Sequence, residues 1–301
     1  ETRYAEIPRE MIAAGTWLSP SLDGMKYFEK PSPGYWPTII SMKAFGENAF
    51  AVRLPQAIAA GLTAILVFLL ARRFRKDSSA PLMAICIQLV IAEAFLVGTF
   101  AVLDGILTLF TTGALTMFYY AWTEKRQLLK QTFLLLAGLS AGCAFMAKGL
   151  IGLAIIGLPA VAFLLWMRDW KAFLTMALAP LAGAFAIAVP WVVAQHLQEP
   201  DFWKYFIMVE HFGRFAGEGA ERHSQPFWFY LPVLLGGLMP FTIFTYSLFK
   251  GAWRLDWRTP FLRYAAAWVV LPVILLSLSS GKLGTYVLPL FPALAVLGAL
   301  M

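Results

Sequence analysis

Long apolar segments limit what this chain can fold into. Such segments cover residues 51–71, 79–99, 103–122, 131–147, 150–167, 173–196, 227–249, 261–279 and 284–301. Most are close to the length of roughly 20 residues that crosses a bilayer as a helix. Hydrophobic residues make up 60% of the 301 residues and charged residues 14%, whereas soluble domains carry roughly 25% charged residues. The sequence therefore predicts an all-α polytopic membrane protein.

The chain has two polar and aromatic stretches, of which residues 1–50 precede the apolar segments and residues 197–226 interrupt them. In the first we expect short amphipathic helices near 3–14 and 35–45, separated by a turn rich in Pro and Gly. The predicted organisation is a juxtamembrane segment at 1–50, about six transmembrane helices at 51–196, a loop at 197–226 and about three transmembrane helices at 227–301.

The short loops predict the orientation. Loops 72–77, 123–130, 168–171 and 250–263 fall on one side and hold 13 of the 24 Lys and Arg. Short basic loops face the cytoplasm, so the two polar stretches are expected on the outer face. The net charge of +7 follows from this topology and gives no indication of a nucleic acid partner.

Other features exclude several classes of protein. Cys86 and Cys143 lie in apolar segments, which argues against a disulfide framework and a zinc–thiolate site. The Walker A and HExxH motifs are missing from the sequence, which disfavours nucleotide-driven enzymes and zinc hydrolases. Because the chain begins at Glu1 and stops inside an apolar segment, we expect a fragment truncated at both ends.

The stretch 26-KYFEKPSPGYWP-37 is the first candidate site. The Glu29 carboxylate is a hard ligand for a metal ion, and the Lys30 ammonium is a point charge suited to phosphate. Tyr27, Tyr35 and Trp36 are expected at headgroup level. The alternative interpretation is an ordinary solvated pair of charges on a loop.

Three more charged residues are expected at the outer ends of membrane helices. Asp104, near the end of its segment, is a functional-site hypothesis or else forms a structural hydrogen bond. Lys148 contacts a phosphate or is a snorkelling anchor. Lys282, followed by Tyr286 in the same turn, anchors at the headgroups or contacts a phosphate.

The polar loop supplies further candidates. Glu210, His211, Arg214 and His223 lie close together in sequence. A histidine with a distant glutamate can hold a divalent ion, and the alternative is a loop that closes over the surface. Together, the charged groups at the outer face suit an amphiphile with an anionic head and a lipid tail.

Seven motifs in order carry a family resemblance over essentially the whole chain. They are ETRYAEIPREMIAAGTW, KYFEKPSPGYW, FGENAFAVRLPQA, VLDGILTLF, EHFGRF, QPFWFYLP and SSGKLGTYVLPLFPALA. They resemble the bacterial undecaprenyl phosphate-aminoarabinose transferases, among the protein-mannosyltransferase-like GT-C glycosyltransferases. The resemblance implies a GT-C helical bundle of the Gram-negative inner membrane, with periplasmic juxtamembrane helices and a periplasmic site. It also implies transfer of 4-amino-4-deoxy-L-arabinose from undecaprenyl phosphate to lipid A phosphate, which confers polymyxin resistance.

The same resemblance assigns roles to residues. The family's catalytic aspartate would directly precede Glu1, and Asp104 and Lys30 are the catalytic candidates within the chain. Substrate contacts are expected from Arg3, Tyr4, Tyr27, Lys30, Lys148, Arg214, Lys282 and Tyr286. Glu29 would bind a divalent ion such as zinc with His211, or with His223 as second choice. No nucleotide is expected.

Two other functions remain open. One is a related polyprenyl-phosphate-sugar transferase, such as a mannosyltransferase, acting on protein or another glycan. The other is a lipid transporter or flippase, which would place its polar groups near the middle of the bilayer on broken helices. Because the polar residues here gather at the outer face, the sequence disfavours the transporter.

Overall fold

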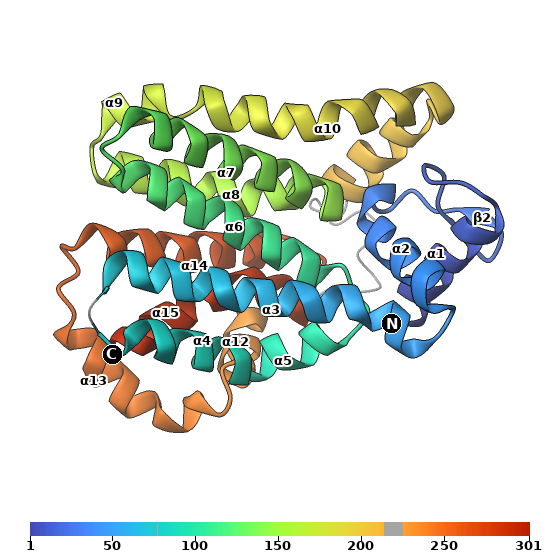
Figure 1. Ribbon diagram of the computed structural model, residues 1–301. Helices are drawn as coiled ribbons and strands as arrows, with labels where there is room; N and C mark the ends of the chain where they lie inside the picture. Colours follow the sequence, from blue (N-terminus) through green and yellow to red (C-terminus); the bar gives the residue numbers. More distant parts are fainter. Residues whose placement is uncertain (77, 214–224) are drawn as a thin grey trace.

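The computed structural model describes residues 1–76, 78–213 and 225–301 as a bundle of long helices (Figure 1). The longer helices are α3 (Ala49–Phe74), α6 (Asp104–Thr123), α7 (Gln127–Lys148), α8 (Leu150–Trp166), α10 (Leu178–Gln198) and α14 (Pro260–Leu278). Within this described part, four helical stretches are long and apolar enough to cross a membrane, or five if one bent pair counts as a span.

The two ends of the bundle differ in character. One end carries α9 (Trp170–Thr175), α13 (Thr245–Arg254) and the C-terminus, next to basic loops (Figure 1). The N-terminus, α1 (Thr2–Ala13) and α2 (Trp36–Phe45) lie at the opposite end, which we call the outer end. This separation agrees with the predicted placement of the basic loops and the N-terminal segment on opposite sides.

Helix α6 lies inside the bundle, against α3, α7 and α8. Fourteen of its 20 residues are buried, including several threonines. The hydroxyls of Thr108 and Thr111 donate to the carbonyls of Asp104 and Leu107 one turn earlier, which satisfies them without water. Because α6 faces protein rather than lipid, its sequence is more polar than that of a lipid-exposed span.

Helices α7 and α10 are in close contact because glycines line their interface. A Cβ atom added to Gly138 would lie 2.1 Å from the Pro180 carbonyl oxygen, and one added to Gly183 would lie 2.7 Å from that of Leu135. Small residues at such contacts let two backbones approach, which favours van der Waals packing within a membrane. This packing fixes α7, and with it Lys148 at the outer end of that helix.

Three predicted helices are interrupted. The segment 79–99 forms α4 (Ala80–Val90) and α5 (Ala92–Thr99), bent by 56° at the break. The predicted continuous helix over 227–249 is wrong, since α12 (Tyr230–Gly237) ends before Pro240, which lacks the N–H a helix interior needs. The last segment begins as the 3-10 helix η6 (Gly284–Leu290) and becomes α15 (Phe291–Leu300) only afterwards.

The N-terminal segment contains both predicted short helices and a hairpin that the periodicity did not predict. Strands β1 (Ser21–Leu22) and β2 (Met25–Lys26) pair antiparallel around a two-residue turn. The turn residues Asp23 and Gly24 both have positive φ, at 53° and 74°, as a type I′ turn requires. A 3-10 turn, η1 (Ser32–Tyr35), then leads into α2.

Candidate active site at the outer end of the bundle

Asp104 and Lys148 form a buried ion pair where α6 begins and α7 ends. The Lys148 Nζ lies 2.5 Å from the Asp104 Oδ1, and the two side chains are 6% and 5% exposed. The Tyr286 ring of η6 lies below the same ammonium, 4.0 Å from Nζ to the ring centroid. The structure therefore brings together three residues that the sequence analysis chose separately.

Lys30 forms a second buried ion pair. Its Nζ donates to the Glu210 Oε1 at 2.5 Å and to the Glu29 carbonyl oxygen at 3.0 Å. Glu210 lies on the π-helix η2 (Lys204–Gly213), and the sequence analysis named it among the polar residues of the loop without giving it a role. Its sequence signal was a lone carboxylate in the apolar run YFIMVEHF, because a buried carboxylate needs a cationic partner.

A third group involves Arg3, Tyr27 and Glu29. The Tyr27 hydroxyl donates to the Glu29 Oε2 at 2.7 Å, and the Arg3 Nη1 donates to the Tyr27 oxygen at 3.1 Å. Burial, followed by the Glu29 carboxylate, raises the pKa of the Tyr27 phenol well above its usual range. The phenol therefore stays protonated and remains the donor of this hydrogen bond.

Two aromatic residues join this group to the ion pair on α6. The Tyr4 and Tyr35 rings stack with centroids 6.4 Å apart. Burial raises the pKa of the Tyr4 phenol, and the nearby Asp104 carboxylate raises it further. Tyr35 is buried, at 1% exposed, so its side chain packs against protein, and its place at headgroup level stays a prediction.

Gly34 holds the N-terminal turn against the ends of α6 and α7. A Cβ atom at Gly34 would lie 3.0 Å from the Ala147 carbonyl oxygen and 3.2 Å from the Leu103 Cδ1. These two residues directly precede Lys148 and Asp104 in the chain. The missing side chain of Gly34 thus lets the turn that carries Lys30 approach both members of the other ion pair.

Lys282 is buried but differs from the other two lysines. Its Nζ donates to the backbone carbonyls of Ser279 at 2.6 Å and Gln225 at 2.9 Å, and the residue is 5% exposed. Burial disfavours the simple headgroup anchor. The carbonyl oxygens keep the ammonium at the outer turn that precedes η6.

The predicted metal ligands are only partly described by the structure. Arg214 and His223 lie outside the described residues, and so does the side chain of His211. Among the described residues, no three His, Cys, Asp or Glu side chains gather as a metal site. Glu29, the one described ligand candidate, already accepts a hydrogen bond from Tyr27. A divalent ion at Glu29 stays a prediction.

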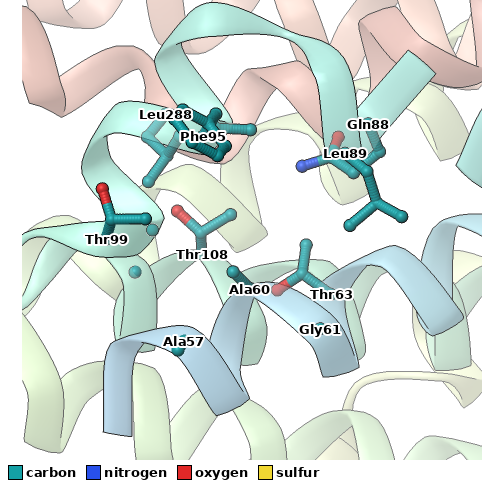
Figure 2. A pocket seen from close by; sticks show the side chains of 13 residues that line it. Ala57, Ala60, Gly61, Thr63, Gln88, Leu89, Phe95, Thr99, Thr108 and Leu288 are labelled. Carbon is teal, nitrogen blue, oxygen red and sulfur yellow. The ribbon is translucent and has the colours of Figure 1, made fainter. Parts of the chain in front are cut away.

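A cavity of about 230 Å³ opens beside the first turn of α6 (Figure 2). Small residues of α3, including Ala57, Ala60 and Gly61, line it together with the bent pair α4–α5. Gln88 also lines it and is buried, and its Oε1 has no hydrogen-bond partner. The mostly apolar lining suits a hydrocarbon chain.

Comparison with known proteins places these features in a family context. The chain is 42% identical to the undecaprenyl phosphate-alpha-4-amino-4-deoxy-L-arabinose arabinosyl transferase of Edwardsiella ictaluri, covering 99% of this chain and 54% of that protein. The protein of the same name from Aeromonas salmonicida is 40% identical, with the same coverage. The chain thus spans about half the length of the curated relatives it matches.

Solved structures show the same fold. The crystal structure of ArnT from Cupriavidus metallidurans bound to undecaprenyl phosphate superposes with a TM-score of 0.89 at 28% identity, covering 99% of this chain and 54% of that one. The apo structure of the same protein gives a TM-score of 0.87 at 27% identity, covering 99% of this chain and 53% of that one. The fold and the polar outer end therefore define a multi-pass membrane protein of the GT-C glycosyltransferase type.

The N-terminal two thirds of the chain identify its family. The family model of the dolichyl-phosphate-mannose-protein mannosyltransferases matches residues 1–206. The chain belongs to this family.

Proposed function

We propose that this chain carries the phosphate-binding part of an inner-membrane glycosyltransferase. The enzyme transfers 4-amino-4-deoxy-L-arabinose from undecaprenyl phosphate to a lipid A phosphate at the periplasmic face. The names of the relatives supply the sugar and its carrier. Modification of lipid A would lower its negative charge and so protect the cell from polymyxin and other cationic peptides.

One observation carries the proposal. Two buried lysines, Lys30 and Lys148, lie at the outer end of the bundle on elements that Gly34 holds in contact. Each ammonium group is paired with a carboxylate, Glu210 for Lys30 and Asp104 for Lys148, and a lysine charge at this end of the bundle suits the phosphate head of a lipid. The apolar cavity beside Asp104 supports the proposal, since a lipid-linked substrate needs space for its chain.

The proposed reaction is a direct displacement at the anomeric carbon. An oxygen of the lipid A phosphate donates an electron pair and forms the new bond to this carbon. The bond from the carbon to the carrier phosphate breaks, and its electron pair leaves on undecaprenyl phosphate. The charge that develops on this leaving group is stabilised by Lys30 and Lys148. No strong base is needed, because the acceptor phosphate is already anionic.

Asp104 and Tyr286 position Lys148 for this task. The carboxylate contacts the Lys148 Nζ from one side and the aromatic ring from another. The Glu1 carboxylate accepts hydrogen bonds from the Arg53 Nε at 2.6 Å and the Ala101 backbone N–H at 3.3 Å.

A divalent ion such as zinc is also part of the proposal, with Glu29 and His211 as ligands and His223 as second choice. When bound, the ion would supply positive charge beside the carrier phosphate. Metal analysis of the purified full-length protein tests this assignment. We expect about one equivalent of metal, reduced in both Glu29→Gln and His211→Ala. An unchanged metal content in both variants would contradict it.

The function is tested by mass spectrometry of lipid A. The full-length gene is expressed in a Gram-negative strain that makes the aminoarabinose carrier but lacks its own transferase. The expected result is a mass increase of one aminoarabinose per modified phosphate, lost in Lys30→Ala. Unmodified lipid A, with the protein present in the membrane, would overturn the lipid A assignment. It would favour a related transferase acting on protein or another glycan.

A further inference from the structure

The partner of Lys30 has no assigned role in the reaction. The Glu210 Oε1 lies 2.5 Å from the Lys30 Nζ, and the side chains are 10% and 5% exposed for the lysine and the glutamate. The two residues come from separate elements, the turn before η1 and the π-helix η2. Lys148 differs, since its carboxylate partner Asp104 belongs to the proposed reaction site.

The ion pair with Glu210 weakens the attraction between Lys30 and a phosphate. In the structure the lysine charge is already balanced by a carboxylate at contact distance, and burial weakens the screening of both charges. A second anion that approaches the same ammonium is repelled by Glu210 and attracted by Lys30. The phosphate therefore has to compete with Glu210 for the lysine.

We propose that Glu210 is a positioning residue that competes with the carrier phosphate for Lys30 and thereby promotes release of the product. This inference rests on the proposed function. The donor is a phosphodiester with one negative charge, whereas the product, undecaprenyl phosphate, is a monoester whose charge approaches two at neutral pH. The product is therefore the tighter ligand of Lys30. Glu210 lowers that affinity and takes the place of the phosphate as it leaves.

The test compares binding and turnover in the full-length protein reconstituted in nanodiscs. Glu210→Gln keeps the size of the side chain and removes its charge. We expect this variant to bind undecaprenyl phosphate about tenfold more tightly than the wild type. The KM for the donor should fall, and kcat should fall with it, because release of the product becomes slower.

Two variants serve as controls. Glu210→Asp keeps the competing charge and should bind undecaprenyl phosphate with nearly wild-type affinity. Glu199 pairs with Lys26 at the same distance, 2.5 Å, in a more exposed ion pair outside the proposed site. Glu199→Gln should therefore leave the affinity, KM and kcat unchanged. If Glu210→Gln does not yield folded protein, Glu210→Ala removes the same charge.

The outcomes separate this inference from the function on which it rests. The inference is supported if Glu210→Gln binds undecaprenyl phosphate more tightly and turns over more slowly than the wild type, while Glu210→Asp and Glu199→Gln do neither. Equal or weaker binding in a folded Glu210→Gln variant overturns it and leaves the function intact, as does failure of both neutral variants to fold. A wild-type protein that binds no undecaprenyl phosphate, or binds it equally well after Lys30→Ala, removes the phosphate assignment and this inference together.

Discussion

At the scale of single residues, Lys148 and Asp104 depend on each other, because both charged side chains are buried. Each charge alone would be expensive at this depth, since removing one partner of a buried pair costs about 3–5 kcal/mol. The contact of Lys148 with the Tyr286 ring adds a weaker attraction to the aromatic face. The loss of either charged residue therefore affects stability and activity together, and the two effects need to be separated.

A double substitution separates the effect of Lys148 on stability from its effect on activity. Lys148→Met should lower the free energy of unfolding by about 3–5 kcal/mol, because it leaves a buried carboxylate unpaired. Transfer should fall on the order of 10²–10³-fold through loss of a group that stabilises the leaving phosphate. Adding Asp104→Asn should restore most of the stability and none of the activity. Thermal unfolding in detergent and lipid A mass spectrometry measure the two effects.

The exposed Lys26 provides the control for that experiment, because Lys26→Ala should change neither quantity. Recovery of transfer in the double variant would contradict the role given to Lys148. Recovery of stability alone would support it.

At the scale of elements, the position of the η1 turn depends on one glycine. Gly34→Ala would place a methyl group 3.0 Å from the Ala147 carbonyl oxygen, which is backbone and yields little. We expect a loss of about 1–3 kcal/mol in stability, as for overpacked sites, and a larger relative loss of transfer. The reason is that the turn carrying Lys30 shifts away from α6 and α7.

Gly157 is the matched control for Gly34. It lies within α8, and an added Cβ would meet nothing within 4 Å. Gly157→Ala should therefore be neutral or stabilise by about 0.5–1 kcal/mol, with full transfer activity. Equal behaviour of the two variants in thermal unfolding and transfer assays would disprove the packing role of Gly34.

The cavity beside α6 gives a second prediction at this scale. An added Cβ at Gly61 of α3 meets open space, so Gly61→Trp can extend into the cavity without a backbone clash. If a substrate chain occupies the cavity, this variant should raise the donor KM about tenfold or more while unfolding like the wild type. Gly61→Ala should keep the wild-type KM. An unchanged KM in Gly61→Trp would exclude this cavity as the lipid site.

At the scale of the whole molecule, the distribution of basic loops predicts that the two ends of the bundle face different compartments. We expect the end with α1, α2 and the hairpin to face the periplasm, because short basic loops remain in the cytoplasm. Cysteine labelling of the full-length protein, with Cys86 and Cys143 replaced by Ser, tests this. Lys26→Cys should react with an impermeant maleimide in spheroplasts, and Lys125→Cys only after the membrane is opened. The reverse pattern would move the site to the cytoplasm.

Much of the site was predictable from residue type and position. Asp104 and Lys148 stand out in the sequence because charges at the ends of apolar segments are costly and rarely retained without a role. Their mutual contact was not predictable, because 44 positions separate them along the chain. The pairing of Glu210 with Lys30 was not predictable for a similar reason: the two residues are 180 positions apart, and only the packing of η2 on the N-terminal turn brings them together.

The membrane class, the different polarity of the two ends and most helix positions were predictable from the chain, since these depend on local hydrophobicity and on charge counted along it. Which charges neutralise one another and where the predicted spans break depends instead on contacts between distant segments. The break between α4 and α5 is an example, since the Ala92 N–H donates to the Met239 carbonyl of a distant segment. A backbone group freed inside a membrane needs such a partner, and the fold alone supplies it.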